Sequence, residues 1–571
     1  MNRGQLFLKI LIIVMMPIFP TGFITAKEKK YADKDAFAEG NKTYYIAKDY
    51  HFQSDTVKVG KNSSLFFLGG SIIGGNLQFD NVTIKGRPLF VDCSMTGSVS
   101  NKTIKMKWFK GDFSQNIRSA VEISPKEGSE ILFEKEKEYM AFWRDRSFLV
   151  SLKDNMVIEG NNSTIKIADG VNSKDFTWGC IFRITRTKGV TIKNLTMDFN
   201  GEHNDILQDM SNIYWERNGL VIAEFADGLT IFNCHLLNNR GCNDITVFSS
   251  KGVKIHDCKF INSGQIKPNS YLADHSSLLA LDCKNCEIYN NRIENDVLRE
   301  IGSGYDVCLE DSYFHDNYVD NNYNGMNLSA INSSKNVRIE GNKFVDNTFA
   351  LTLWSYGKSR DFPNGRKVED ITIKNNTFRW TACNGQYYCR GINFTMHTLG
   401  VTRNVIVDNN QFESTIGSET DMLKSFEYAI YVGVAPEAVN TEIARAENII
   451  ISNNIFSTTT GPAIRLTDKA FSISITDNTF KDCSCSEFEN SGYGVIAASV
   501  ENRTTLSDVE VSRNRFNNDR YNRGKYAVAL YNSLSNVDVR DNDIKLLSKS
   551  GLFIAPEIRE LHSEKKDIVF K

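Results

Sequence analysis

The chain has 571 residues, and its 67 Lys and Arg are balanced by 69 Asp and Glu, which gives a formal net charge of −2 at pH 7. This balance excludes a protein that binds nucleic acid through bulk positive charge, and it excludes a long acidic tail. Hydrophobic residues make up 41% and aromatic residues 11% of the chain, which is ordinary for a globular protein with a large core. Two counts are unusual: only 9 residues are Pro, whereas 57 are Asn. Such an excess of Asn indicates a structure that uses this residue repeatedly at one kind of turn.

The first 26 residues have the pattern of a secretory signal peptide. Arg3 and Lys9 flank the start of an apolar run from Ile10 to Phe19, and small and turn residues follow up to Ala26. A membrane anchor is the alternative, but this run is too short for a bilayer, which needs roughly 20 apolar residues. The first cysteine is Cys93, which disfavours a lipid anchor near the cleavage site. We therefore expect an exported protein, periplasmic or secreted, with no transmembrane segment after cleavage.

The twelve cysteines are scattered along the chain and do not suggest a small disulfide scaffold. Cys283 and Cys286 have the spacing of zinc ligands, and so do Cys483 and Cys485. No second CxxC or HxxxH motif lies at the spacing that would complete a tetrahedral site. We therefore expect structural or disulfide roles for these cysteines.

One short pattern returns along most of the chain: an aliphatic residue, two polar positions, Asn, a variable residue, then Phe or another apolar residue. Nine copies carry Asn at the fourth position, and three earlier copies carry Leu195, Cys234 and Cys258 there. The nine anchor residues are Asn291, Asn317, Asn342, Asn376, Asn410, Asn454, Asn478, Asn514 and Asn542. The distance between successive anchors is irregular but never falls below 24 residues.

The alternation of apolar and polar residues inside each copy predicts a short strand. A coil of short strands accepts insertions at its turns, whereas helical repeats and propeller blades keep a steadier period. Asn tolerates a left-handed turn, and its amide can bond the Asn one coil away. The repeat therefore predicts an all-β fold, a right-handed parallel β-helix of about 12 coils. The sequence here resembles the pectate-lyase-like superfamily, which implies a secreted bacterial protein that acts on carbohydrate.

Five parts follow from these patterns. We expect a signal peptide over 1–26, a strand-rich module over 27–110, a capping helix and connection over 111–150, the β-helix over 151–556, and a C-terminal cap or tail over 557–571. Caps cover the open ends of a β-helix, where strand edges and core are exposed.

The segment from Trp108 to Asp112 partly matches a motif that precedes the capping helix in many secreted bacterial β-helix proteins. The Asp-rich segment that usually follows this motif is shortened here. Ser114 is the N-cap that we expect for the helix.

Cys234 and Cys258 occupy the anchor position in consecutive coils. Their backbones should therefore lie about 5 Å apart, one strand spacing. That distance allows a disulfide between the two coils. It allows two stacked buried thiols equally well.

Acidic residues cluster in three consecutive strands of a second series, between the Asn corners. The candidate catalytic residues there are Asp244, Asp274, His275, Asp282, Asp306 and Glu310, with Asp311 beside them. A general acid and a nucleophile or base are the groups that glycoside hydrolysis needs, and carboxylates supply both.

The register of these strands decides whether two of the carboxylates meet. If Leu279 and Leu281 face inward, Asp282 and Glu310 point outward from one position of neighbouring coils, about 5 Å apart. That separation suits a retaining glycosidase, and like-charge proximity would raise the pKa of one carboxyl. It equally suits a calcium site completed by Asp306, and calcium is the only cofactor that we expect, if there is one. A slip of one residue would turn the pair inward.

Two further groups of residues are candidates for binding substrate. An insertion over 264–276 would wall a groove, and basic residues on it and nearby could contact a uronate: Lys267, Arg240 and Arg299, with Tyr271 beside them. Further along, flat rings and hydrogen-bonding groups follow the same strand series: Trp354, Tyr356, Arg390, His397 and Tyr431. Sugar rings rest on such platforms, although ordinary packing under a loop explains aromatic residues as well.

The interpretation that these features favour is an exported carbohydrate-active protein that cleaves a polysaccharide in a groove along the β-helix, by hydrolysis or by elimination. The alternative is a non-catalytic glycan-binding or surface adhesion protein. The sequence lacks the adjacent Asp-Asp, Gly-His-Gly and Arg-x-Lys set of polygalacturonase-like hydrolases and a clear calcium-and-arginine set of pectate lyases. A phage tailspike is a third possibility, which the signal peptide pattern disfavours.

Overall fold

The computed structural model describes residues 31–570 with internal gaps. The gaps are 146, 172–179, 205–218, 240–242, 264–275, 297–301, 330–332, 356–365, 382–388, 398, 416–425, 435–442, 468, 484–493, 499–504, 519–525, 531–532, 547–551 and 555–567. The segment 1–26, where we predict a signal peptide, and most of the predicted C-terminal cap therefore lie outside the described residues. None of the helices in the described part has both the length and the apolar run that a bilayer crossing requires.

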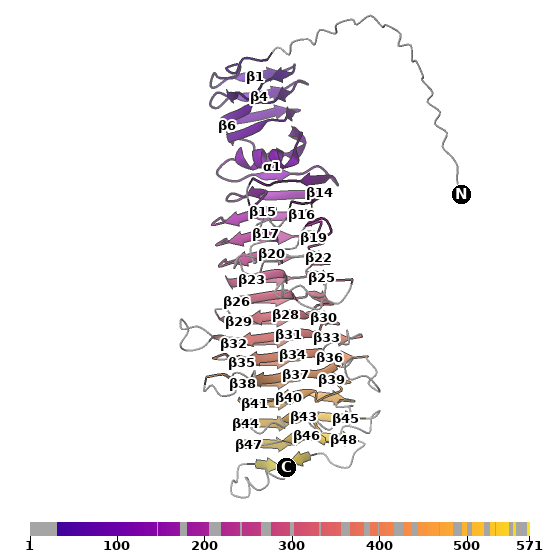
Figure 1. Cartoon of the computed structure of the whole chain (residues 1–571). Helices are drawn as coiled ribbons and strands as arrows, with labels where there is room; N and C mark the ends of the chain where they lie inside the picture. Colours follow the sequence, from indigo (N-terminus) through magenta and orange to yellow (C-terminus); the bar gives the residue numbers. More distant parts are fainter. Residues whose placement is uncertain are drawn as a thin grey trace, which may run out of the picture.

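The chain forms a right-handed parallel β-helix, as the repeat predicts, and Figure 1 shows its coils stacked along one axis. Each coil of the main part contributes one strand to each of three parallel sheets, which we call sheets 1, 2 and 3 in the order that the chain visits them. β14 (Val157–Ile167) and β16 (Thr191–Asp198) each span sheets 2 and 3, and β26 (Ser303–His315) spans sheets 1 and 2.

The other strands of sheet 1 are β13 (Val150–Ser151), β15 (Phe182–Thr185), β17 (Gly219–Glu224), β20 (Asn243–Phe248), β23 (Ser276–Lys284), β28 (Asn324–Ser329), β31 (Phe349–Ser355), β34 (Cys389–Met396), β37 (Phe426–Val434), β40 (Ile464–Leu466), β43 (Gly494–Ala498), β46 (Tyr526–Leu530) and β49 (Leu552–Ile554).

The other strands of sheet 2 are β9 (Thr103–Lys105), β11 (Glu130–Leu132), β18 (Thr230–Phe232), β21 (Lys254–His256), β24 (Glu287–Tyr289), β29 (Ser334–Glu340), β32 (Lys367–Lys374), β35 (Val401–Asp408), β38 (Arg445–Ser452), β41 (Ala470–Thr476), β44 (Thr505–Ser512), β47 (Ser533–Arg540) and β50 (Ile568–Phe570).

The other strands of sheet 3 are β12 (Glu138–Ala141), β19 (His235–Leu237), β22 (Lys259–Ile261), β25 (Arg292–Glu294), β27 (Tyr318–Asp320), β30 (Lys343–Val345), β33 (Thr377–Trp380), β36 (Gln411–Ser414), β39 (Ile455–Ser457), β42 (Thr479–Lys481), β45 (Arg515–Asn518) and β48 (Asp543–Leu546).

The N-terminal module consists of short strands that also pair in parallel, in the orders β1-β4-β6-β3 and β10-β7-β5-β2, with β8 on β6. Its elements are β1 (Thr43–Ile46), β2 (Tyr50–His51), β3 (Thr56–Lys58), β4 (Ser64–Phe67), β5 (Ile72–Ile73), β6 (Asn76–Gly86), β7 (Phe90–Val91), β8 (Ser94–Val99), the 3-10 helix η1 (Met106–Trp108) and β10 (Phe109–Lys110).

The anchor Asn residues form a continuous buried ladder at the corner between sheets 2 and 3. From Asn291 to Asn514, each backbone N–H and each Nδ2 donates to Oδ1 of the anchor one coil further on, at 2.9 to 3.1 Å. The predicted ladder is confirmed. The expected left-handed turn is displaced by one residue, because the residue before each anchor has the positive φ, as at Asn409 (54°) and Asn453 (56°). That residue turns the corner, which leaves the anchor amide free to point inward.

The apolar residues beside the anchors stack inside the helix, as predicted. Six fully buried rings of sheet 3 lie parallel, with centroids 4.7 to 5.2 Å apart: Phe344, Phe378, Phe412, Phe456, Phe480 and Phe516. The ladder and this stack set the register of every coil, and so they place the side chains on the outer faces as well.

Cys234 and Cys258 remain unpaired and buried, which agrees with stacked thiols and not with the alternative of a disulfide. Burial and the hydrogen bond with Cys234 raise the pKa of the Cys258 thiol well above its ordinary value. Cys283 and Cys286 are also free and buried, and Cys483 is buried.

The capping helix α1 (Phe113–Glu122) covers the end of the β-helix with a buried face that includes Ile117 and Val121. Its N-cap is Asp112, whose carboxylate accepts from Ser114 N at 3.3 Å and Gln115 N at 2.9 Å. The prediction of Ser114 as N-cap is wrong: its hydroxyl instead accepts from Phe142 N at 2.9 Å.

We expect Asp112→Ala to destabilise α1 by about 1 kcal/mol, because two backbone N–H groups lose their acceptor. Hydrogen exchange of the α1 amides should therefore quicken about fivefold. An unchanged exchange rate would show that the cap does not hold the helix.

Candidate functional site

The outer face of sheet 1 differs from the outer faces of the other sheets. Strands of sheets 2 and 3 alternate between buried and accessible residues, whereas every residue of β17 is buried and β28 has only one that is not. Insertions in the chain also flank sheet 1: 11 residues separate Ser414 from Phe426, and 11 separate Ser355 from Lys367. The chain passes from Lys374 to Thr377 at the Asn corner with only two residues between. Sheet 1 is therefore the face where a recessed site can form.

One row of outward side chains follows the register of sheet 1 from coil to coil. We call the row the outer strip: Asp306, Asn327, Thr352, Asn393, Tyr431 and Arg465. Successive members lie on adjacent strands, which are about 4.8 Å apart. The outer strip thus runs parallel to the helix axis, carboxylate first, then amides, then a ring and a cation.

Two amides of the outer strip have an acceptor that no described residue uses. Asn327 Nδ2 donates to Asp306 Oδ1 at 3.2 Å, and Asn393 Nδ2 donates to Thr395 Oγ1 at 2.9 Å. Oδ1 of each Asn is buried and receives no hydrogen bond from the described residues. Both residues retain only 7 to 8% of their surface. A buried acceptor is costly when unsatisfied, so a small shift of either side chain that exposed its oxygen to a ligand hydroxyl would gain a hydrogen bond.

Arginines and tyrosines gather at the C-terminal end of the outer strip. The Arg390 guanidinium lies 4.7 Å from the centroid of the Tyr431 ring and 5.3 Å from that of Tyr428. It lies 5.7 Å from the Phe349 ring, which is its register partner on the preceding coil. Arg465 contacts Tyr428 from the next coil, over the ring at 5.1 Å and through a hydrogen bond to the hydroxyl. Two cations therefore share one set of rings, which fixes the positions of both.

Tyr431 lies flat along its own strand because residue 433 is a glycine. A Cβ added at Gly433 would meet Tyr431 Cε1 and OH at 2.5 Å. Any larger residue at position 433 would push the Tyr431 ring away from the outer face of sheet 1. We call this group the Arg–Tyr cluster, and its members are Arg390, Phe349, Tyr428, Tyr431 and Arg465. Backbone register and the missing side chain at Gly433 place its rings.

Trp354 and His397 form a second pair on the same face. Their rings meet edge to face with centroids 5.7 Å apart. Trp354 is the register partner of Ser329 and Thr395, one pleat away from the outer strip. The structure therefore pairs Trp354 with His397 and Arg390 with Tyr431, all four of which the sequence predicted as binding residues, and it adds Tyr428 and Arg465 to the second group.

The expected register at the acidic strands is wrong. Leu279 and Leu281 face outward, where they pack with Cys308 in a small apolar cluster beside Phe248. Leu278 and Ala280 take the inward positions instead, and a bulge in β23 then follows: two residues separate Ala280 from Cys283, but only one separates Val307 from Leu309.

Because of this bulge, Asp282 and Glu310 do not occupy equivalent positions. Glu310 lies opposite Lys284 and forms an ion pair with it at 2.5 Å. Asp282 lies at the corner with a φ of 57° and accepts from Ser249 Oγ at 3.1 Å. The expected side-by-side pair does not form, and each carboxylate has a structural partner.

The remaining predicted acids are spread out. Asp244 is fully buried near the start of β20, and Asp311 accepts from Asn336 Nδ2 at 2.7 Å at the next corner. Of the predicted acids that the structure describes, Asp306 is the one on the outer strip. Within the described ranges no three His, Cys, Asp or Glu side chains converge as metal ligands would, so the calcium set of Asp282, Glu310 and Asp306 is not assembled there.

Several predicted residues lie outside the described residues. They are Arg240, Lys267, Tyr271, Asp274, His275, Arg299 and Tyr356.

One acid that the sequence did not single out has a perturbed pKa. Burial, followed by repulsion from Asp346, raises the pKa of Asp320 to about 6. Asp320 ends a strand of sheet 3, and the chain enters sheet 1 only four residues later at Asn324. Its Oδ1 is buried and accepts no hydrogen bond from the described residues. Such a group is a candidate proton donor at the edge of sheet 1.

The raised pKa of Asp320 predicts a pH-dependent stability. The native state binds more protons than the unfolded state between about pH 4 and pH 6, so this group destabilises the fold as the pH rises through that window. From pH 4 to pH 7, we expect the free energy of unfolding of the wild type to fall by about 1 kcal/mol relative to that of Asp320→Asn. The effect stays this small because partial exposure to water screens the charge of Asp320. The urea midpoints of the wild type and of Asp320→Asn, measured at pH 4 and at pH 7, test this prediction. It would be contradicted if the two proteins differed in stability by the same amount at both pH values.

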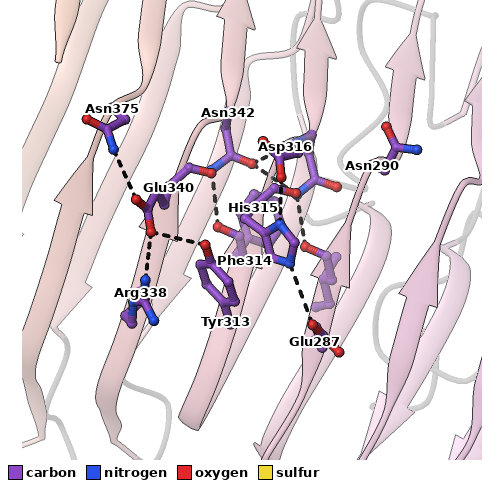
Figure 2. A network of polar contacts seen from close by, with 12 residues as sticks. Glu287, Asn290, Tyr313, Phe314, His315, Asp316, Arg338, Glu340, Asn342 and Asn375 are labelled. Atoms are coloured by element: carbon purple, nitrogen blue, oxygen red, sulfur yellow. Dashed lines mark hydrogen bonds and ion pairs between the residues drawn. The ribbon is translucent and has the colours of Figure 1, made fainter.

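The outer face of sheet 2 carries a polar network with a different character (Figure 2). Glu340 accepts from Arg338 at 2.7 Å, from the Tyr313 hydroxyl at 3.0 Å and from Asn375 at 3.0 Å. Burial raises the pKa of Glu340, but these hydrogen bonds outweigh it and hold the pKa below its ordinary value. A carboxylate held charged by three donors is a structural group rather than a proton donor.

Four rings beside this network stack along the axis: Phe232, His256, Tyr289 and His315, with centroids 4.6 to 5.0 Å apart. Their faces cover one another, so the stack presents edges to solvent. Sugar rings rest on aromatic faces, and this stack is therefore a poorer platform than the Arg–Tyr cluster.

Comparison with known proteins identifies the fold. No protein-family model matches the chain, and no curated protein sequence matches it. Solved structures do match: an aspartate-to-asparagine mutant of the tailspike protein of E. coli bacteriophage HK620 in complex with a pentasaccharide has a TM-score of 0.60 and 11% identity over 80% of this chain and 76% of that one. A glutamate-to-alanine mutant with a pentasaccharide has a TM-score of 0.55 and 12% identity over 78% of this chain and 75% of that one. A deletion mutant with a hexasaccharide has a TM-score of 0.52 and 11% identity over 78% of this chain and 74% of that one. The chain therefore shares the right-handed parallel β-helix fold of these tailspike proteins.

Proposed function

We propose that this protein binds a polysaccharide lengthwise along the outer strip of sheet 1. The observation that carries the proposal is that the amides of Asn327 and Asn393, whose oxygens accept from none of the described residues, lie in one register row with Tyr431 and Arg465. Sugars need acceptors for their hydroxyls, donors for their oxygens and a flat apolar surface for their rings. The outer strip supplies all three within six coils.

The elongated shape of the outer strip favours a chain of sugars over a single sugar. Its members repeat about every 4.8 Å along the axis, so Asp306 and Arg465 are separated by about 24 Å. Arg390 and Arg465 offer planar arrays of donors, which suit ring hydroxyls and the carboxylate of a uronate alike. The oligosaccharides bound to the tailspike proteins of the same fold support this class of ligand.

Cleavage of the bound polysaccharide is the second candidate function, and Asp306 is the observation that favours it. Its carboxylate faces outward at the first position of the outer strip, beside Asn327. A carboxylate in that place can act as a general acid, base or nucleophile toward a bound glycoside. The signal peptide pattern of the first 26 residues supports a protein that meets its polysaccharide outside the cell.

A panel of immobilised neutral and acidic polysaccharides tests both candidates. Binding by the wild type supports the first proposal, and silence across the panel contradicts it. Release of reducing ends or of unsaturated products identifies cleavage. If Asp306 takes part in cleavage, Asp306→Asn abolishes the product but keeps the binding. If the wild type binds without forming product, cleavage is excluded for that panel.

A further inference from the structure

A hollow that is separate from sheet 1 lies where the N-terminal module meets β9 of sheet 2. It has a volume of about 630 Å³, and four of its lining residues are cations: Lys85, Arg87, Lys105 and Lys107. No Asp or Glu lines it. A basic hollow of this size is unexpected in a chain whose charges balance overall.

The hollow lies beside the end of β6, where one edge of that strand has no strand neighbour among the described residues. The end of β6 pairs with β4 on one side, from Thr83 to Gly86. On its other side the backbone N–H of Ile84 donates to Asn101 Oδ1, and Asn101 Nδ2 donates to the carbonyl of Ile84, both at 2.9 Å. A single amide side chain thus takes the place of a strand, and the space beside it is open.

None of the four cations forms an ion pair with a described residue, although cations elsewhere often do. Lys284 binds Glu310 and Arg403 binds Glu369, both at 2.5 Å. The acid that contacts the wall of the hollow, Glu130, accepts from Thr103 Oγ1 at 3.3 Å. Four like charges around one hollow repel one another, so an anion bound among them is stabilised.

A ridge of rings adjoins the cations on the same outer face. Lys85 is the register partner of Phe66, and Phe66 is the register partner of Tyr45. The rings of Tyr45 and Phe66 meet edge to face with centroids 5.9 Å apart, and Tyr45 is 63% exposed. Leu68, at 56% exposed, continues the apolar surface. Exposed rings beside cations suit a ligand that has both apolar ring faces and negative groups.

We propose that this hollow is a second binding site, for an acidic oligosaccharide. Its carboxylate or sulfate groups bind among Lys85, Arg87, Lys105 and Lys107, and a sugar ring rests against Phe66 and Tyr45. The site does not depend on the outer strip of sheet 1, so the protein can hold one polysaccharide at two separated places. Two such contacts would raise the apparent affinity for a long chain without any new contact.

Calorimetric titration of the full-length protein tests this site. The probe is a heparin-derived hexasaccharide, which carries both sulfates and uronates, and maltohexaose is the neutral control. We expect heparin hexasaccharide to bind and maltohexaose not to bind at this site. The double variant Lys105→Gln/Lys107→Gln should weaken heparin binding at least tenfold and flatten its dependence on salt. Tyr45→Ala should weaken it about threefold or more, because the sugar ring loses its support.

The matched control is Lys58→Gln/Lys61→Gln, which removes two exposed lysines of the same module that do not line the hollow. This control should change the affinity less than twofold. Arg379→Ala, which removes a cation from the outer face of sheet 3, should leave heparin binding intact, so that loss of positive charge alone does not explain the effect. Equal binding by the two lysine double variants would overturn the proposal. It would also be overturned if a 12-base-pair DNA duplex or inorganic phosphate bound as tightly as the hexasaccharide, since the hollow would then select charge alone.

Discussion

Arg390→Ala is expected to weaken polysaccharide binding at sheet 1 at least tenfold. The Arg390 guanidinium touches the rings of Phe349, Tyr428 and Tyr431 at 4.7 to 5.7 Å. The substitution removes its hydrogen-bond donors from the outer face of sheet 1 and also removes the cation that lies against the Tyr431 ring. A hydrogen bond between a charged group and a ligand contributes about 1.5 to 3 kcal/mol, which exceeds the 1.4 kcal/mol that corresponds to tenfold.

The measurement is a binding isotherm for whichever polysaccharide the wild type retains on the panel. Arg379→Ala is the matched control, because Arg379 lies on the outer face of sheet 3, where it pairs with Glu413 at 3.5 Å. The control should bind as the wild type does. Arg390→Lys should recover only part of the affinity, because an ammonium keeps the charge but not the planar array of donors. Equal affinity for Arg390→Ala and Arg379→Ala would exclude the Arg–Tyr cluster from the binding site.

Asn410→Ala is expected to destabilise the β-helix by about 3 kcal/mol. Asn410 Nδ2 donates to the carbonyl of Ile373 and to Asn454 Oδ1, and Asn410 Oδ1 accepts twice from Asn376. All these groups are buried, so the substitution leaves several of them without partners at about 1 to 3 kcal/mol each, part of which relaxation recovers. The damage should spread to the coils on either side, because each coil is held by its neighbours.

Urea unfolding followed by circular dichroism, with limited proteolysis to locate the opening, measures this effect. Gln411→Ala is the control, since Gln411 is exposed and its amide bonds only the exposed Glu413 at 3.3 Å among the described residues. We expect that control to change stability by less than about 0.5 kcal/mol. Equal stability of the two variants would show that the Asn ladder does not hold the coils together.

The fold could be predicted because its strongest determinant is short and repeated. Nine copies carry Asn at the anchor and six of these place Phe two residues later, and the structure turns them into a hydrogen-bonded ladder and a stack of rings. The local backbone was harder to predict, since Asn tolerates a left-handed turn both at the anchor and one residue earlier. The anchor amide must point inward to form the ladder, and this requirement places the left-handed turn one residue earlier.

The candidate site could be predicted only in part. Trp354, Arg390, His397 and Tyr431 stand out as aromatic or basic residues in apolar strands, whereas Asn327 and Asn393 do not stand out in a chain so rich in Asn. The acidic pair failed because Leu279 and Leu281 face outward and a bulge at Leu281 and Asp282 then shifts the register, and nothing in this continuous apolar run marks either feature. Arg465 could have been found from its place in the strand series, one coil after Tyr431.

Hydrogen exchange of the full-length protein, with and without the polysaccharide that it retains on the panel, tests the central claim most directly. The account predicts slower exchange in β28, β31, β34 and β37, which carry the outer strip from Asn327 to Tyr431. Slower exchange confined to the outer faces of sheets 2 and 3, or no change in any sheet 1 strand while the polysaccharide is bound, would contradict it.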